Sequence, residues 1–158
     1  MFRHNNVTSL LTRSRYFADH NPPYQSYSSL NGSIGAGGGI YNRIGRGFPD
    51  VSALGDNGAI VAQGQATLEG GTSMAAPIIA AIFTRINEER IAAGKGPIGF
   101  ANPTLYAHPE IFNDITVGNQ AQGGCGTDGF SAVEGWDPVT GLGTPKYGEM
   151  LEVFLSLS

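Results

Sequence analysis

The sequence predicts one mixed α/β domain, and three observations lead to this fold class. First, the chain has 158 residues, which is the size of one ordinary domain. Second, two short strand-like runs at 59–62 and 65–68 are separated by Gln63-Gly64, which is the pattern of a β-hairpin. Third, apolar residues recur with helical spacing in 74–90 and again in 147–157. We find no internal repeat and no linker between domains.

The first 47 residues predict little regular structure. Residues 1–20 are polar, with a few apolar side chains that one helix would bring together. Pro22 and Pro23 end any such helix, because proline donates no backbone N–H and restricts the residue before it. Residues 25–47 predict a loop rich in serine and glycine. Its glycine run at 35–39 lacks the Gly-Lys-Ser/Thr ending of a phosphate-binding loop, so we interpret it as backbone that needs conformational freedom.

Residues 51–69 predict β-structure. The segment from Val51 to Ala53 is interpreted as a short strand, and Asp56-Asn57-Gly58 is a turn signal. The two strands of the hairpin follow at 59–62 and 65–68.

Residues 74–90 predict the longest helix. Alanines make its N-terminal half apolar on all sides, so we expect that half to be buried and the polar end at Asn87–Arg90 to reach solvent. Thr72 or Ser73 is expected to cap its N-terminus, and Gly94 to end it. Its apolar face consists of Ile78, Ile79, Ile82, Phe83 and Ile86.

The C-terminal third is rich in loops. One helical turn is expected at 103–106, glycines recur through 118–143, and a closing helix is expected at 147–157.

Composition and charge exclude several classes of partner. Lys and Arg number 9 and Asp and Glu 13, so the net charge is −4, which argues against nucleic acid. No apolar run is long enough to span a bilayer, and the N-terminus is too polar for a signal peptide. The low charge and the glycosylation patterns at Asn6 and Asn31 are typical of extracellular proteins, although such patterns also occur by chance. Cys125 is the only cysteine, so it is either a free buried thiol or half of a bridge to another chain.

The sharpest local motif is the run Gly70-Gly71-Thr72-Ser73 before the long helix. A serine there suits a nucleophile, because glycines let a substrate approach the backbone and the first helical turn stabilises a negative oxygen. The alternative is that Ser73 is only a helix cap. A serine nucleophile also needs a base. The three histidines stand in no recognisable catalytic context; they are His4, His20 and His108.

A second feature combines carboxylates with glycine-rich loops. Asp114-Ile115 and the run from Val133 through Gly135 to Asp137 offer carboxylate and carbonyl oxygens, which are the ligands that Ca²⁺ prefers. The spacing is not that of an EF-hand. The alternative is that these aspartates cap turns.

Several segments together resemble the sedolisins, the serine-carboxyl peptidases that include tripeptidyl peptidases and fungal secreted acid proteases. They occur in the family's order between about residues 36 and 155, whereas residues 1–15 match poorly. Subtilisins share the Gly-Thr-Ser-Met-Ala-Ala-Pro string but not the Gly-Trp-Asp-Pro or Asn-Asp-Ile-Thr strings, so we rank them second. The matching segments are Gly45–Ala53, Gly71–Ser73, Phe112–Gly118 and Gly135–Pro145.

The resemblance implies a partial subtilisin-like fold, with a mostly parallel sheet flanked by helices and a C-terminal calcium-binding loop region. It implies that Ser73 is the nucleophile and that one Ca²⁺ is bound. In fungal members the position of Cys125 often carries a bridged cysteine. The implied calcium ligands are Asp114 and Asp137 through carboxylates, and Ile115, Val133 and Gly135 through main-chain carbonyls.

The resemblance also implies what the chain lacks. The family's glutamate base, the aspartate that orients it and the oxyanion aspartate all precede the nucleophile by more than the 72 residues available here. We therefore interpret residues 1–158 as the C-terminal part of a peptidase domain whose N-terminal half is missing. We expect the complete relative to be extracellular, to hydrolyse proteins or peptides and to favour acid, and the chain alone to be inactive and prone to aggregation. Three alternatives remain: a non-catalytic, calcium-stabilised extracellular module, a fragment of a subtilisin-like protease, and a fragmentary gene product without function.

Overall fold

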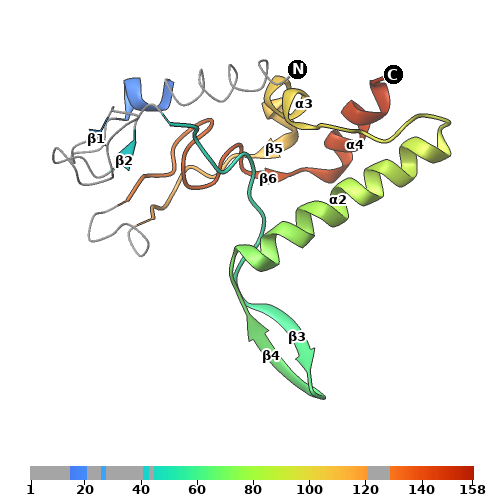
Figure 1. Cartoon of the computed structure of the whole chain (residues 1–158), viewed down its shortest axis with the longest axis horizontal. Helices are drawn as coiled ribbons and strands as arrows, with labels where there is room; N and C mark the ends of the chain where they lie inside the picture. The colour runs from blue at the N-terminus through green and yellow to red at the C-terminus, as the bar shows by residue number, and fades with distance from the viewer. Residues whose placement is uncertain (1–14, 21–25, 28–40, 43–44, 121–128) are drawn as a thin grey trace. The chain divides into compact units, whose positions relative to one another are not determined.

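The computed structural model describes residues 15–20, 26–27, 41–42, 45–120 and 129–158 (Figure 1). The chain forms two compact units. The first unit combines Met1–Asp50 with Thr116–Gly141, and the second combines Val51–Ile115 with Leu142–Ser158. Each unit is described below by itself.

The first unit is organised around aromatic side chains. Residues 15–19 are helical, and β1 (Ser26–Tyr27) pairs in parallel with β2 (Tyr41–Asn42). Neighbouring ring centroids lie 5.1 to 6.4 Å apart, mostly edge to face, which is a favourable geometry for aromatic pairs. All of these rings except that of Tyr16 also line a pocket of about 350 Å³. The clustered rings are those of Tyr16, Phe17, Tyr41, Phe130 and Trp136.

The loop that carries Trp136 is held in place by contacts across the first unit. The Trp136 indole N–H donates to the Pro49 carbonyl at 2.9 Å, and its side chain is buried. Gly47 lies against the ring, where an added Cβ would be only 2.5 Å from the indole. Arg46 and Asp50, which flank Gly47 and Pro49 in sequence, form an ion pair at 2.8 Å. A larger residue at position 47 would therefore displace Trp136 from its place.

The hairpin predicted in the second unit is confirmed. It consists of β3 (Gly58–Ala62) and β4 (Gln65–Glu69), which pair antiparallel. Gln63 and Gly64 have φ angles of 52° and 79°, and a two-residue turn with both φ values positive suits the twist of a hairpin. By contrast, Val51–Ala53 is not a strand. The Ser52 N–H donates to the Gly143 carbonyl at 3.0 Å. The segment does not pair with any strand of this unit.

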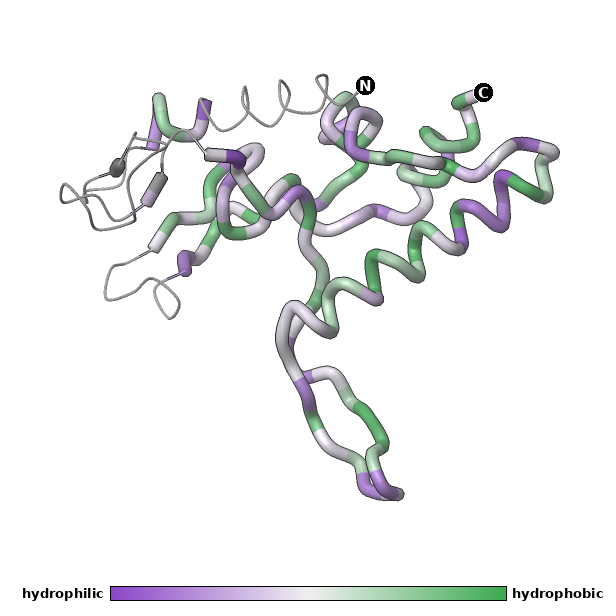
Figure 2. Tube along the Cα trace, in the orientation of Figure 1, coloured by the Kyte–Doolittle hydropathy of each residue, from purple (hydrophilic) through white to green (hydrophobic). Residues whose placement is uncertain are grey.

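Helix α2 (Thr72–Ala92) begins where the glycine motif predicts, but its capping and burial differ from our expectation. Gly71 is the N-cap, and no side chain caps the helix, because Thr72 and Ser73 already lie within the first turn. The N-terminal half is largely exposed, and Arg90 at the other end is only 3% exposed. The reason is that helix α4 (Tyr147–Ser156) packs against the C-terminal half of α2, whereas no described element covers the first half (Figures 1 and 2).

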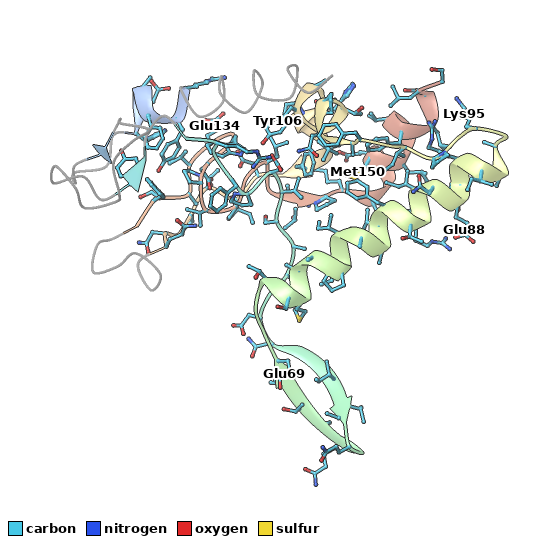
Figure 3. All side chains as sticks on the ribbon, in the orientation of Figure 1. Glu69, Glu88, Lys95, Tyr106, Glu134 and Met150 are labelled. Carbon is cyan, nitrogen blue, oxygen red and sulfur yellow. The ribbon has the colours of Figure 1, made fainter. Side chains whose placement is uncertain are left out.

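The remaining elements of the second unit form its core. The predicted helical turn is α3 (Asn102–Ala107), and the predicted closing helix is α4 (Tyr147–Ser156). Between them lie η2 (Pro109–Ile111) and the antiparallel pair of β5 (Phe112–Asn113) with β6 (Thr144–Pro145). Figure 3 shows Met150 of α4 among the core side chains. The core consists of Ile86, Leu105, Ile111, Phe112, Met150 and Phe154.

Arg90 connects three segments of this core. Its guanidinium donates to the carbonyl oxygens of Gly96, Leu157 and Ser158 at 2.7 to 3.2 Å, and also to that of Phe154 near the end of α4. A cation there suits the partial negative charge at a helix C-terminus. The prediction that the Asn87–Arg90 run reaches solvent is wrong for Arg90. Its guanidinium is buried because these carbonyl oxygens accept its hydrogen bonds in the interior.

The described sheets are small. They are three two-stranded pairs, of which β1–β2 alone is parallel, so the described part of the chain does not contain the mostly parallel sheet that we expected. A parallel sheet needs long crossover connections between its strands and elements that cover both of its faces. No helix in the described ranges is long and apolar enough to cross a membrane.

Candidate active site

Ser73 lies in the first turn of α2 and is exposed to solvent. Before it, Gly71 has φ 119° and ψ 168°, a conformation that glycine adopts readily and other residues do not. The Gly71 N–H donates to the Gly55 carbonyl at 2.6 Å, and the Gly71 carbonyl accepts from Met74 N–H at 2.9 Å. The junction of hairpin and helix thus presents the Ser73 hydroxyl to solvent, at the end of α2 where backbone N–H groups lack intrahelical partners.

No described side chain serves Ser73 as a base. Among the described residues no hydrogen bond joins its hydroxyl to a carboxylate or an imidazole. Among the acidic groups that precede it, Asp50 pairs with Arg46 and Asp56 accepts from Asn57, whereas Glu69 is exposed at the end of β4. His108 pairs with Glu110 at 2.8 Å. The pKa of Glu110 lies below its ordinary value, chiefly because its own backbone N–H donates to the carboxylate and also because His108 does.

Asp137 organises the loop that carries the predicted ligands Val133 and Gly135, all in the first unit. Its side chain is 0% exposed. Oδ1 accepts from the backbone N–H groups of Val139 and Thr140, both at 2.8 Å, and Oδ2 accepts from Val133 N–H at 3.1 Å. Gly135 has φ 84°, which allows the tight turn between them. The turn-capping role that we gave as the alternative is thus present, and the Thr140 hydroxyl also donates to both oxygens of this carboxylate at 3.3 Å.

The other two predicted ligands lie in the second unit. Asp114 and Ile115 follow β5 directly; Asp114 is exposed and Ile115 is half-buried. Gly143 packs so closely on the Asn113 carbonyl that a Cβ there would overlap it, and this contact orients the chain entering Asp114. Within the described ranges, no group of three or more His, Cys, Asp or Glu side chains is gathered for a metal. Calcium binding therefore stays a prediction.

Two features of this region were missed by reasoning from the sequence. Gly55 accepts the hydrogen bond that orients Gly71, but nothing in its local sequence distinguishes it from an ordinary turn glycine. Arg90 stands in a polar run that looks solvated. A lone arginine on the same helical face as Ile86 and Phe83 is the one signal that would have indicated burial. Cys125, His4 and the glycosylation patterns at Asn6 and Asn31 lie outside the described residues.

Comparisons with known proteins identify the class. No family model matches the chain. It is 60% identical over 143 residues to tripeptidyl-peptidase sed1 of Aspergillus fumigatus, covering 90% of this chain and 22% of that protein. It is 56% identical over 142 residues to aorsin of Aspergillus oryzae, covering 90% of this chain and 21% of that protein.

A solved structure supports the same assignment. Pseudomonas sedolisin, a serine-carboxyl proteinase, matches with a TM-score of 0.55 and 26% identity, over 85% of this chain and 35% of that one. The resemblance to the sedolisins is therefore confirmed, because both the homologues and the structural neighbour of this chain are sedolisins. In particular, the chain is homologous to the fungal tripeptidyl-peptidases of that family. The chain spans about a fifth of the length of the curated relatives it matches.

Proposed function

We propose that this chain is the nucleophile-bearing C-terminal part of a sedolisin-type peptidase, which hydrolyses peptide bonds at acid pH outside the cell. The observation that carries the proposal is the exposed hydroxyl of Ser73 in the first turn of α2, directly after Gly71. The homology to tripeptidyl-peptidases supports it.

The proposed mechanism divides the work between this chain and the rest of the domain. Ser73 attacks the peptide carbonyl, while a glutamate that the resemblance implies upstream takes its proton. An upstream aspartate donates a hydrogen bond to the oxyanion. It must be protonated to do so, which favours acid. From this chain, the first turn of α2 adds the positive end of the helix dipole beside the developing charge.

The test places the chain within a complete relative. In a chimera of A. fumigatus tripeptidyl-peptidase sed1, this chain replaces the matching segment. We expect acid turnover of a tripeptide substrate, and Ser73→Ala should lower kcat by roughly 10⁴-fold or more, since loss of the nucleophile removes most catalysis by such a site. The isolated chain should show no turnover above its own Ser73→Ala variant. Ser156→Ala, which removes another exposed helical serine, is the matched control.

Two results would contradict the proposal. One is Ser73-dependent turnover by the isolated chain, which would show that no upstream base is needed. The other is a folded, inhibitor-binding chimera in which Ser73→Ala leaves kcat unchanged. The non-catalytic module predicts a folded chimera that shows no turnover, with or without Ser73.

We also propose that the rest of the peptidase domain covers an apolar surface of the second unit, here called the hairpin–helix surface and defined by Val61 and Leu68 on one face of the hairpin together with Ile78 of α2. Val61 is 75% exposed and Leu68 64% exposed. Figure 2 shows the same hydrophobic stretch along β3 and the first half of α2. Exposed apolar surface of this kind marks an interaction site. The occupant is supported by the match to 35% of the sedolisin chain, which leaves the remainder to cover it.

The isolated chain should therefore self-associate through this surface. Replacing Val61 and Leu68 by threonine keeps a strong strand former while removing apolar area. We expect the double variant to run as a smaller species in size-exclusion chromatography with light scattering. A matched double substitution of exposed apolar residues elsewhere, Phe100→Thr with Val117→Thr, should leave the association unchanged. Equal effects of the two double variants would contradict this assignment.

Calcium binding is the remaining part of the proposal, with Asp114, Ile115, Val133, Gly135 and Asp137 as ligands. When bound, the ion would stabilise the folded state. At a calcium concentration about 100 times Kd, the gain would be roughly 2.7 kcal/mol.

We expect the Tm of the chimera to rise with CaCl₂ and to fall with a chelator, and Asp114→Asn to abolish this response. Asp56→Asn, a change at an exposed turn aspartate, should keep it. An unchanged calcium response in Asp114→Asn would show that the ligand set is wrong.

A further inference from the structure

We propose that Asn57 is a site of spontaneous deamidation, placed at the junction that orients the first turn of α2. Asn57 is exposed, has φ 56° and is followed by Gly58 at the start of β3. Glycine has no Cβ, so its amide nitrogen meets no steric hindrance when it approaches a neighbouring side chain. This inference does not depend on the proposed function.

The reaction needs only water. The Gly58 amide nitrogen loses its proton to solvent and attacks Cγ of Asn57. The N–Cγ bond forms and the Cγ–Nδ2 bond breaks, and Nδ2 leaves as ammonia after taking a proton from water. The product is a five-membered imide. Water then opens it: cleavage of the bond to Cγ gives aspartate, and cleavage of the bond to the main-chain carbonyl carbon gives isoaspartate.

The reacting amide of Gly58 lies at the end of the β3–β4 strand pair. Gly58 faces Glu69 in the last pair of the β3–β4 hairpin, on the strand end that Figure 3 shows beside α2. Terminal pairs open at little cost, which frees the amide. The Asn57 side-chain amide donates to Asp56 Oδ2 at 3.1 Å, a single exposed contact that does not bury it.

The product would disturb the junction before Ser73. A new carboxylate at position 57 would stand next to Asp56 and close to Glu69, so like charges would repel at the base of the hairpin. Isoaspartate would also lengthen the backbone by one methylene. The hydrogen bond from Gly71 N–H to the Gly55 carbonyl, at 2.6 Å, spans the same base. Ageing at Asn57 would therefore loosen the residue that precedes Thr72 and Ser73.

The test is peptide mapping by mass spectrometry after incubation of the folded chain in mildly alkaline buffer. Asn57 is the only asparagine between Arg46 and Arg85, so one tryptic peptide reports it alone. Asn87 and Asn113, which are followed by Glu88 and Asp114, are internal controls. Asn57→Gln is the control variant, because its longer side chain would need a larger ring. Gly58→Ala is unsuitable, since its Cβ would overlap the Met74 sulfur.

We expect conversion of Asn57 to aspartate or isoaspartate, measured as the mass increase of its peptide, to be roughly tenfold faster than conversion of Asn87 or Asn113. The reason is that, of the three, only Asn57 is followed by a residue without a Cβ. Isoaspartyl methyltransferase should label the aged peptide, and the Asn57→Gln chain should stay unlabelled there. Rates at Asn57 equal to those of the two controls would overturn the proposal. So would conversion that occurs only in urea, because the native hairpin would then protect the site.

Discussion

Arg90→Met is expected to lower the free energy of unfolding by about 3 kcal/mol or more, because hydrogen bonds from a charged donor contribute roughly 1.5–3 kcal/mol each. The substitution keeps an unbranched side chain but removes every donor. The carbonyls of Phe154, Leu157 and Gly96 would then be left without this partner beside the core. Lys95, whose ammonium donates to the Leu157 carbonyl at 2.7 Å, cannot replace the planar guanidinium (Figure 3).

The matched control is Arg85→Met on the same helix. Arg85 is 60% exposed and pairs with Glu88 at 2.8 Å, and surface pairs of this kind contribute at most about 1 kcal/mol. Urea unfolding followed by circular dichroism, in the Val61→Thr/Leu68→Thr background that should keep the chain monomeric, measures both. An equal loss of unfolding free energy in the two variants would show that the buried hydrogen bonds of Arg90 stabilise the fold no more than a surface ion pair does.

Asp137→Ala should also cost about 3 kcal/mol or more, and it should do so without calcium. The change leaves the N–H groups of Val133, Val139 and Thr140 without their acceptor, and each buried unpaired group costs roughly 1–3 kcal/mol. Trp136 is the only tryptophan and adjoins this loop, so its fluorescence in urea titrations reports on the first unit.

Measurement in a chelator separates this effect from any loss of metal. Asp56→Ala, at an exposed turn, should change stability by no more than about 0.5 kcal/mol. If Asp137→Ala unfolds like the unsubstituted chain in the chelator, the carboxylate does not organise the loop. Its role would then be confined to the proposed calcium site.

Local sequence signals predicted the hairpin, the long helix and the closing helix. Their bounds depend on residues close in sequence, such as the Gln63-Gly64 turn and the helical spacing that ends with Ile86. The strand expected at Val51–Ala53 failed, because a strand needs a neighbour and that neighbour is not encoded nearby. The helix cap was also misplaced. The sequence shows that hydroxyls follow the glycines, but not at which residue the backbone turns.

The candidate site shows the same division. Ser73 was proposed as the nucleophile because its motif carries the chemistry, and the homology to tripeptidyl-peptidases supports the family while the role of Ser73 stays a prediction. Asp137 was predicted as a calcium ligand, with turn capping as the alternative. The structure shows the capping, but the sequence could not show which three N–H groups are capped, because this depends on how the loop closes on itself.

The sequence alone was enough to predict the family of the homologues, a candidate nucleophile and the order of the main elements, because these predictions rest on contiguous motifs and local periodicity. Only the tertiary structure decided which half of α2 is buried and why Arg90 is tolerated inside. Both depend on α4, which lies more than fifty residues further along the chain and brings the packing surface and the carbonyl oxygens. Whether a side chain is buried depends on the element that packs against it as well as on its own type, and an element distant in sequence leaves no signal in the local pattern.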